Sequence, residues 1–133
     1  MERMLSRLVL IASMGAVLAL PSAVRAQGAF PARQVRIVVP FAPGGTTDFV
    51  ARIIAAHLQQ RLGQPFVVDN RPGGGATVGS QAVADAPADG YTLLVSNSAS
   101  HGVSPALYRT VRYDAMADFT HIGLAATTPQ ALV

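Results

Sequence analysis

The sequence of 133 residues predicts an α/β fold in which helices flank a parallel-rich sheet. Short apolar runs alternate with segments whose apolar residues recur every three or four positions, which is typical of strand–helix–strand units. The first run places Ile37, Val38 and Val39 in succession, a pattern favoured by a strand covered on both faces. The length leaves room for one small domain at most, and its crossovers are expected to be right-handed.

The first strand is predicted at residues 34–41 and the first helix at residues 47–62. Apolar residues recur along this helix at intervals of four, with Arg52 and Gln59 on the other side, which predicts one apolar face. The recurring residues are Val50, Ile54, Leu58 and Leu62. Gly63 stands where a helix C-terminus favours the left-handed conformation, so the helix is expected to end there.

Further elements follow the same alternation. A second strand is predicted at residues 66–69, a shorter helix within residues 76–86, and a third strand at residues 91–97. Beyond the third strand the pattern is weaker. It indicates a short helical segment near residues 104–108 and two strands within residues 121–133. If the first strand lies between the other two, the loops after strands one and three face each other across a crevice.

The N-terminal segment has the three parts of a secretory signal peptide. Two arginines precede an apolar stretch at residues 8–20, and small residues lead up to Ala26. The apolar stretch is shorter than the about 20 residues that a membrane-spanning helix needs. We expect residues 1–26 to be removed between Ala26 and Gln27, which leaves residues 27–133 as a periplasmic chain.

The composition of residues 27–133 excludes several classes of protein. Seven arginines and six aspartates nearly balance, lysine is absent, and the arginines are scattered along the sequence. Without a basic cluster, we expect no nucleic-acid partner. The absence of cysteine excludes disulfides and thiolate metal sites and is compatible with the periplasm. The three histidines lack metal-ligand spacing, so we expect no metal and no cofactor.

The segment PFAPGGTTD, residues 40–48, joins the first strand to the first helix. Gly44 and Gly45 permit close backbone approach, and Thr46 or Thr47 can cap the helix. The remaining N–H groups at the helix start favour an anion, as does the helix dipole. Asp48 is explained as a residue that stabilises this dipole. The alternative is a tight strand-to-helix turn that holds no ligand.

Two phosphate-binding motifs are excluded. A Walker A loop needs a lysine, which the sequence lacks. A dinucleotide fingerprint would begin at Gly73, but Val78 occupies the position of its third glycine, and the loop follows the second strand rather than the first.

The segment SNSASHG, residues 96–102, follows the third predicted strand and is rich in hydroxyl and amide groups. A small esterase could use Ser98 or Ser100 as nucleophile with His101 as base. The G-x-S-x-G elbow is absent, and adjacent Ser and His side chains seldom point at each other. We therefore expect a binding protein and not an enzyme.

Other polar and aromatic side chains are expected to have structural roles. His57 is predicted half-buried on the first helix, and His121 is predicted at the start of a strand. Arg71 is expected to pair with Asp69 or to remain exposed. The tyrosines are expected to pack rather than to stack on bases. They are Tyr91, Tyr108 and Tyr113.

Three segments carry a resemblance. VVPFAPGGTTD, VDNRPGGG and ADGYTLL occur in order, and with them the chain resembles the Bug family of periplasmic solute receptors, the substrate-binding proteins of tripartite tricarboxylate transporters. The resemblance covers essentially all of residues 27–133. It implies a type II periplasmic-binding-protein fold of two domains, a small carboxylate ligand such as an organic acid or amino acid, membrane components of the transporter as partners, and a monomer.

The resemblance also implies a set of ligand-binding residues. It places the ligand carboxylate, partly through bridging waters, against the loop after the first strand, which agrees with the anion predicted at the helix start. The residues of this loop are Phe41, Ala42, Gly44, Gly45, Thr46 and Thr47. On the facing loop the implied residues are Ser96, Asn97, Ser98, Ser100 and His101.

Two features predict an incomplete protein. Family members run to roughly twice this length, beyond one ordinary domain, and the sequence closes on the apolar residues 131–133, which look like the opening of a strand. We expect residues 27–133 to be the N-terminal part of the first domain, which provides one jaw of a two-jaw site. The alternatives are a truncated product without a transport role and, more remotely, the small esterase.

Overall fold

The computed structural model describes residues 30–128. The predicted signal peptide, residues 1–26 with the junction at Ala26 and Gln27, lies outside the described residues, and so do residues 129–133. No helix within the described part of the chain is long and apolar enough to cross a membrane.

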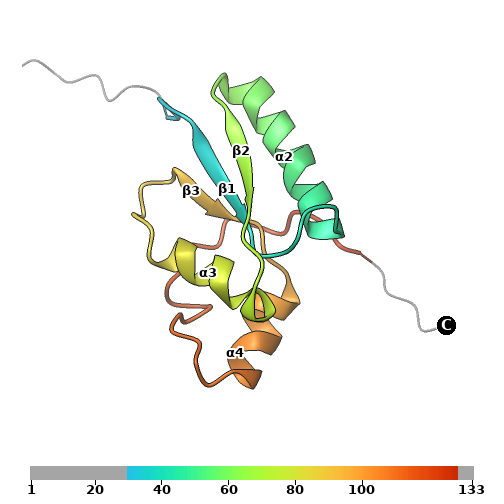
Figure 1. Ribbon diagram of the computed structural model, residues 1–133. Helices are drawn as coiled ribbons and strands as arrows, with labels where there is room; N and C mark the ends of the chain where they lie inside the picture. The colour runs from blue at the N-terminus through green and yellow to red at the C-terminus, as the bar shows by residue number, and fades with distance from the viewer. Residues whose placement is uncertain (1–29, 129–133) are drawn as a thin grey trace, which may run out of the picture.

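Three parallel strands form the sheet, in the order β2, β1, β3 (Figure 1). β1 (Val35–Val39) lies in the centre, β2 (Phe66–Asn70) on one side and β3 (Thr92–Leu94) on the other. In the register of the sheet, Ile37 pairs with Val68 and with Leu93. The prediction of an α/β fold with a parallel sheet is confirmed, and the central place of β1 explains its continuous apolar run, because both faces are covered.

β3 is shorter than the predicted strand at residues 91–97. Its last bond to β1 joins the N–H of Val95 to the C=O of Val38 at 3.0 Å. Ser96 and Asn97 then leave the ladder, because Asn97 turns its backbone N–H to Ser100 Oγ at 3.3 Å. The end of the strand therefore presents these two residues in a loop.

The two longer helices cover opposite faces of the sheet, as right-handed crossovers on either side of β1 require. α2 (Thr46–Leu62) connects β1 to β2, and α3 (Thr77–Ala84) connects β2 to β3. The core beneath α2 joins the inward residues of β1 to the small residues Ala51 and Ala55 of the helix. At the C-terminus of α2, Gly63 has φ 71° and its N–H bonds the C=O of Gln59 at 3.0 Å, so the predicted helix end is confirmed.

The buried face of α2 differs from the predicted apolar stripe. Ala51, Ala55 and Asp48 are the buried residues of this helix, while Val50, Ile54 and Leu58 are half-buried and Leu62 is exposed. Small residues let the helix lie close to the sheet. The larger apolar residues of α2 therefore lie beside the line of closest contact and are only half-buried. His57, predicted half-buried, is exposed.

α3 packs against the start of the loop that follows β1. A Cβ atom at Gly79 would lie 2.8 Å from the Cα of Pro40 and 2.8 Å from the C=O oxygen of Arg71. Only glycine allows this approach. The left-handed turn η1 (Gly74–Ala76) precedes the helix, and it brings the chain back from β2 toward Pro40.

Beyond β3 the chain forms a π-helical turn, η2 (Ala99–Val103), and the short helix α4 (Ser104–Leu107), which confirms the predicted helical segment. Residues 121–128 form no strand, contrary to the prediction, and His121 therefore does not begin one. A strand of three residues offers few backbone groups at its outer edge, so β3 gives this segment little to pair with. Ile122 and Leu124 are both 84% exposed.

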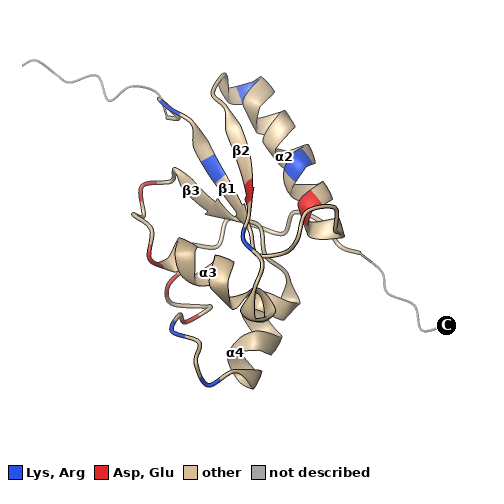
Figure 2. Ribbon diagram, in the orientation of Figure 1, with Lys and Arg blue, Asp and Glu red and all other residues tan. Residues whose placement is uncertain are grey.

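Charged side chains are spread over β1, β2, α2 and the connecting loops without gathering on one face (Figure 2). This distribution matches the scattered arginines of the sequence.

Candidate functional site

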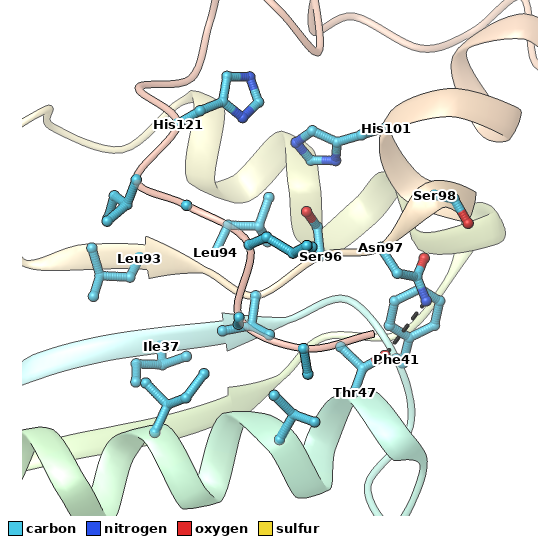
Figure 3. A pocket seen from close by; sticks show the side chains of 18 of the residues that line it. Ile37, Phe41, Thr47, Leu93, Leu94, Ser96, Asn97, Ser98, His101 and His121 are labelled. Atoms are coloured by element: carbon cyan, nitrogen blue, oxygen red, sulfur yellow. Dashed lines mark hydrogen bonds between the residues drawn. The ribbon is translucent and has the colours of Figure 1, made fainter. Parts of the chain in front are cut away.

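A cavity of about 950 Å³ opens where β1 and β3 end (Figure 3). Its apolar wall comes from the sheet and from the half-buried side of α2, where Ile54 and Leu58 face Leu93. Its polar wall comes from the start of α2 and the loop after β3. Residues 119–126 and Thr128 close it on the remaining side. The predicted crevice between the loops after strands one and three is therefore present.

Most of the implied ligand-binding residues line this cavity. They are Phe41, Gly45, Thr46, Thr47, Ser96, Asn97, Ser98 and His101. The two loops touch where Asn97 Nδ2 donates to Thr47 Oγ1 at 3.4 Å. Ala42, Gly44 and Ser100 are not among the lining residues.

The start of α2 differs from the predicted threonine cap. Gly45 is the N-cap, no side chain caps the helix, and Thr46 and Thr47 already lie in its first turn. The first backbone hydrogen bond of the helix runs from the N–H of Phe49 to the C=O of Gly45 at 3.0 Å. The preceding N–H groups have no intrahelical acceptor, so the cavity receives the positive end of a helix of 17 residues.

A buried carboxylate holds the loop in place. Asp48, 4% exposed, accepts hydrogen bonds from the Gly44 N–H at 2.9 Å and from Arg52 Nε at 3.0 Å. Its other oxygen accepts from Asn70 Nδ2 at 3.0 Å, and the same amide nitrogen lies 3.1 Å from the C=O of Phe41. Gly44 therefore gives its N–H to this network and not to the cavity.

The same contacts set the charge of Asp48. The Arg52 hydrogen bond, with those from Gly44 and Asn70, lowers the pKa of Asp48 to about 2. The carboxylate is ionised at neutral pH, and Arg52 offsets its charge beside the start of α2. Arg52 also reaches Asn70 Oδ1 at 3.2 Å.

Sequence reasoning missed Arg52 and Asn70 and gave Asp48 only a dipole role. The spacing of Asp48 and Arg52 by four residues on one helix was a usable signal for an ion pair. Asn70 ends β2, beside the end of β1, but nothing local in the sequence tells which loop its amide bonds.

The Ser100 and His101 side chains do contact each other, contrary to the expectation for adjacent residues. Ser100 Oγ lies 3.1 Å from His101 Nδ1. The hydroxyl donates its one proton to the C=O of Asn97 at 3.0 Å, so Nδ1 of His101 is the donor in the contact. Ser100 is fully buried. The pair therefore lacks both the exposed hydroxyl and the free base that a nucleophilic serine requires.

Arg71, Tyr91 and Tyr113 have the structural roles that were predicted, while Tyr108 is 46% exposed. Arg71 Nε bonds Asp69 Oδ2 at 2.8 Å. Tyr91 packs edge-on against Phe30 with ring centroids 5.1 Å apart, and the Tyr113 hydroxyl donates to the C=O of Ser100. Among the residues that the structure describes, no group of three potential metal ligands occurs.

Residues 50–133 match the sequence profile of the tripartite tricarboxylate transporter family receptors. The chain belongs to this family. Protein BugT of Bordetella pertussis is 43% identical to it over 105 residues, which are 78% of this chain and 32% of BugT. The resemblance to Bug receptors seen in the three sequence segments is thereby confirmed.

Solved structures agree with this assignment. MatC from Rhodopseudomonas palustris, determined with bound malate, superposes with a TM-score of 0.69 at 45% identity, over 72% of this chain and 33% of MatC. Rpa4515 of R. palustris, determined with adipate, superposes with a TM-score of 0.63 at 48% identity, over 65% of this chain and 29% of that protein. The periplasmic-binding-protein fold is confirmed for the matched part, and the chain spans about a third of the length of such relatives.

Proposed function

We propose that this chain binds a small carboxylate, an organic acid or an amino acid, as part of a periplasmic solute receptor of a tripartite tricarboxylate transporter. The observation that carries the proposal is the start of α2 at the cavity, where uncapped N–H groups and Thr47 face the polar loop after β3. Neutral donors at a helix N-terminus favour an anion. Two similar proteins hold the dicarboxylates malate and adipate.

The ligand-binding residues belong to the same proposal. Eight of the implied residues line the cavity, and we assign ligand contacts to them. Gly44 and Ser100 are proposed to support the cavity wall indirectly, since Gly44 bonds Asp48 and Ser100 bonds Asn97. A ligand contact of Ala42 is proposed from the family resemblance alone. We also propose that the signal peptide is cleaved between Ala26 and Gln27 and that residues 27–133 are the N-terminal part of the first of two domains. The receptor is proposed to be monomeric and to contact the membrane components of the transporter.

Binding without chemistry is the preferred function over the small esterase. Ser100 is buried and its proton is used by the backbone. Hydrolysis of a chromogenic ester that disappears in Ser98→Ala or Ser100→Ala would revive the esterase.

The proposal is tested by titrating the chain with adipate and malate in a calorimeter. We expect saturable binding that Thr47→Val weakens, because the hydroxyl that Asn97 contacts is lost. Thr110→Val is the matched control, since Thr110 is exposed and outside the cavity. Absence of heat with both acids at millimolar concentration would contradict the proposal.

A further inference from the structure

The cavity wall contains two ionisable side chains among its described residues, His101 and His121. No arginine, lysine, aspartate or glutamate lines it. The ring centroids of the two histidines lie 6.1 Å apart, and Figure 3 shows them together on the side of the cavity away from Phe41 and Thr47. Within residues 30–128, a positive side chain therefore forms at the cavity wall only by protonation of this pair.

Hydrogen bonds fix which ring nitrogen of each histidine is available. His101 Nδ1 donates to Ser100 Oγ at 3.1 Å, since the hydroxyl proton goes to Asn97. His121 Nε2 lies 3.1 Å from the C=O of Ala115 and donates to it. The remaining positions, Nε2 of His101 and Nδ1 of His121, carry lone pairs in the neutral rings and become donors after protonation.

In the part of the chain that the structure describes, neither histidine forms an ion pair with a carboxylate. Two aromatic rings pack against His101. The distance from its ring centroid is 4.9 Å to that of Phe119 and 6.2 Å to that of Tyr113. Asp114 accepts from the N–H groups of Met116 and Ala117, and Asp118 accepts from the N–H of Asp114. Across the cavity, Asp48 is bound to Arg52 and Asn70. An anion is the missing partner of a protonated pair.

We propose that His101 and His121 form a proton-linked subsite for the second carboxylate of a dicarboxylate whose first carboxylate lies at the start of α2. This proposal rests on the function proposed above. Each bound dicarboxylate draws a proton from solvent onto the pair, which then donates to the carboxylate oxygens.

In the free site, the surroundings of His101 disfavour its protonated form. Burial, and then the proximity of His121, lowers the pKa of His101. An anion between the rings raises the pKa of the pair, so protons are taken up on binding and affinity rises as pH falls. A monocarboxylate that fills only the first position leaves the pair neutral.

The test compares adipate with hexanoate, which has the same number of carbons and one carboxylate. Calorimetry between pH 8 and pH 6.5, in buffers of different ionisation enthalpy, measures both affinity and proton uptake while both acids stay ionised. We expect adipate affinity to rise about tenfold over this range with proton uptake, and hexanoate affinity to stay constant. Titration of the histidine ring signals by NMR should show raised pKa values for His101 and His121 with adipate.

Two variants sharpen the result. His121 is exposed, so His121→Gln should fold, and it should bind adipate more weakly, with a smaller rise in affinity as pH falls, because only one of the two ring donors remains. His57→Gln replaces the exposed histidine of α2 outside the cavity and should behave as the unmodified chain. The ring titration of the unmodified chain needs no variant, so misfolding of His121→Gln would leave the test intact.

Each contrary result has a distinct meaning. Adipate binding without pH dependence or proton uptake overturns the histidine subsite and leaves the proposed function standing. Equal proton linkage for hexanoate overturns the assignment of the second carboxylate. Absence of binding by both acids overturns the subsite and the proposed function together.

Discussion

The two sides of the cavity are built differently. The loop after β1, residues 40–48, is fixed by a buried carboxylate with three donors and by the close contact of Gly79 with Pro40. The opposite side, residues 119–128, contains no helix or strand, and its Ile122 and Leu124 are 84% exposed. The loop after β1, where we propose that the first carboxylate binds, is therefore held by several contacts, and the opposite side is held by few.

The largest expected effect is at the contact beneath the rigid loop. Gly79→Ala places a Cβ 2.8 Å from backbone atoms of Pro40 and Arg71, so α3 has to move away from the loop. We expect a loss of about 3 kcal/mol in the free energy of unfolding, measured by urea denaturation. Gly123→Ala is the control, because nothing lies within 4 Å of its added Cβ. Equal stability of the two variants would show that α3 does not support the loop.

The second effect concerns the carboxylate network. Asp48→Asn puts an amide where Arg52 and the Gly44 N–H need acceptors, and we expect the melting temperature to fall by about 5 °C at pH 7. Asp118→Asn, at an exposed aspartate outside the cavity, is the control. A melting temperature unchanged by Asp48→Asn would remove the basis for a rigid loop.

The same residue predicts a pH dependence. The pKa of Asp48 is lowered from 3.8 to about 2 on folding, so its contribution is fully present above pH 4 and is lost as pH falls through 2. Between those values we expect the melting temperature of the unmodified chain to fall more steeply than that of Asp48→Asn. Parallel curves would mean that Asp48 has the same pKa in the folded and unfolded chain.

Away from the cavity wall, a smaller effect is expected at Ser104, the first residue of α4. Its hydroxyl donates to the C=O of Gly75 and ties α4 to η1. Ser104→Ala should reduce the free energy of unfolding by about 1 kcal/mol, measured by thermal unfolding. A much larger loss would show that the contact of α4 with η1 matters for stability as much as the contacts of the loop after β1.

The smallest effect is expected at Ser80, whose fully buried Oγ has no hydrogen-bond partner among the described residues. Replacing an unsatisfied hydroxyl by a methyl group is neutral or mildly stabilising. Ser80→Ala should therefore change the free energy of unfolding by less than about 1 kcal/mol, in contrast to Ser104→Ala. Marked destabilisation would indicate an internal water bound at Ser80.

The sequence was most informative where local chemistry decides the structure. The apolar run of β1 and the αL residue Gly63 follow from short patterns, and both are confirmed. The prediction of the buried face of α2 was wrong. The sequence pattern marks the large apolar residues, whereas the residues packed closely against the sheet are Ala51 and Ala55. The predicted strand at residues 121–128 failed for a tertiary reason, since β3 is too short to pair with it.

The residues of the candidate site also fall into those that local sequence predicts and those that only tertiary contacts reveal. Glycines and threonines at the start of α2 could be singled out from composition, whereas the roles of Asn70 and Arg52 depend on the approach of β2 to the loop after β1. The meeting of His101 and His121, twenty positions apart in sequence, likewise follows from the return of the chain over the cavity and from no local signal.

The most direct test of carboxylate binding at the start of α2 is an amide NMR titration of the chain with adipate. We expect the largest chemical-shift changes at the N–H signals of Gly45, Thr46 and Thr47, followed by those of Ser96 and Asn97, and we expect these changes to saturate. Saturable changes centred elsewhere, or none at these amides at millimolar adipate, would contradict this expectation.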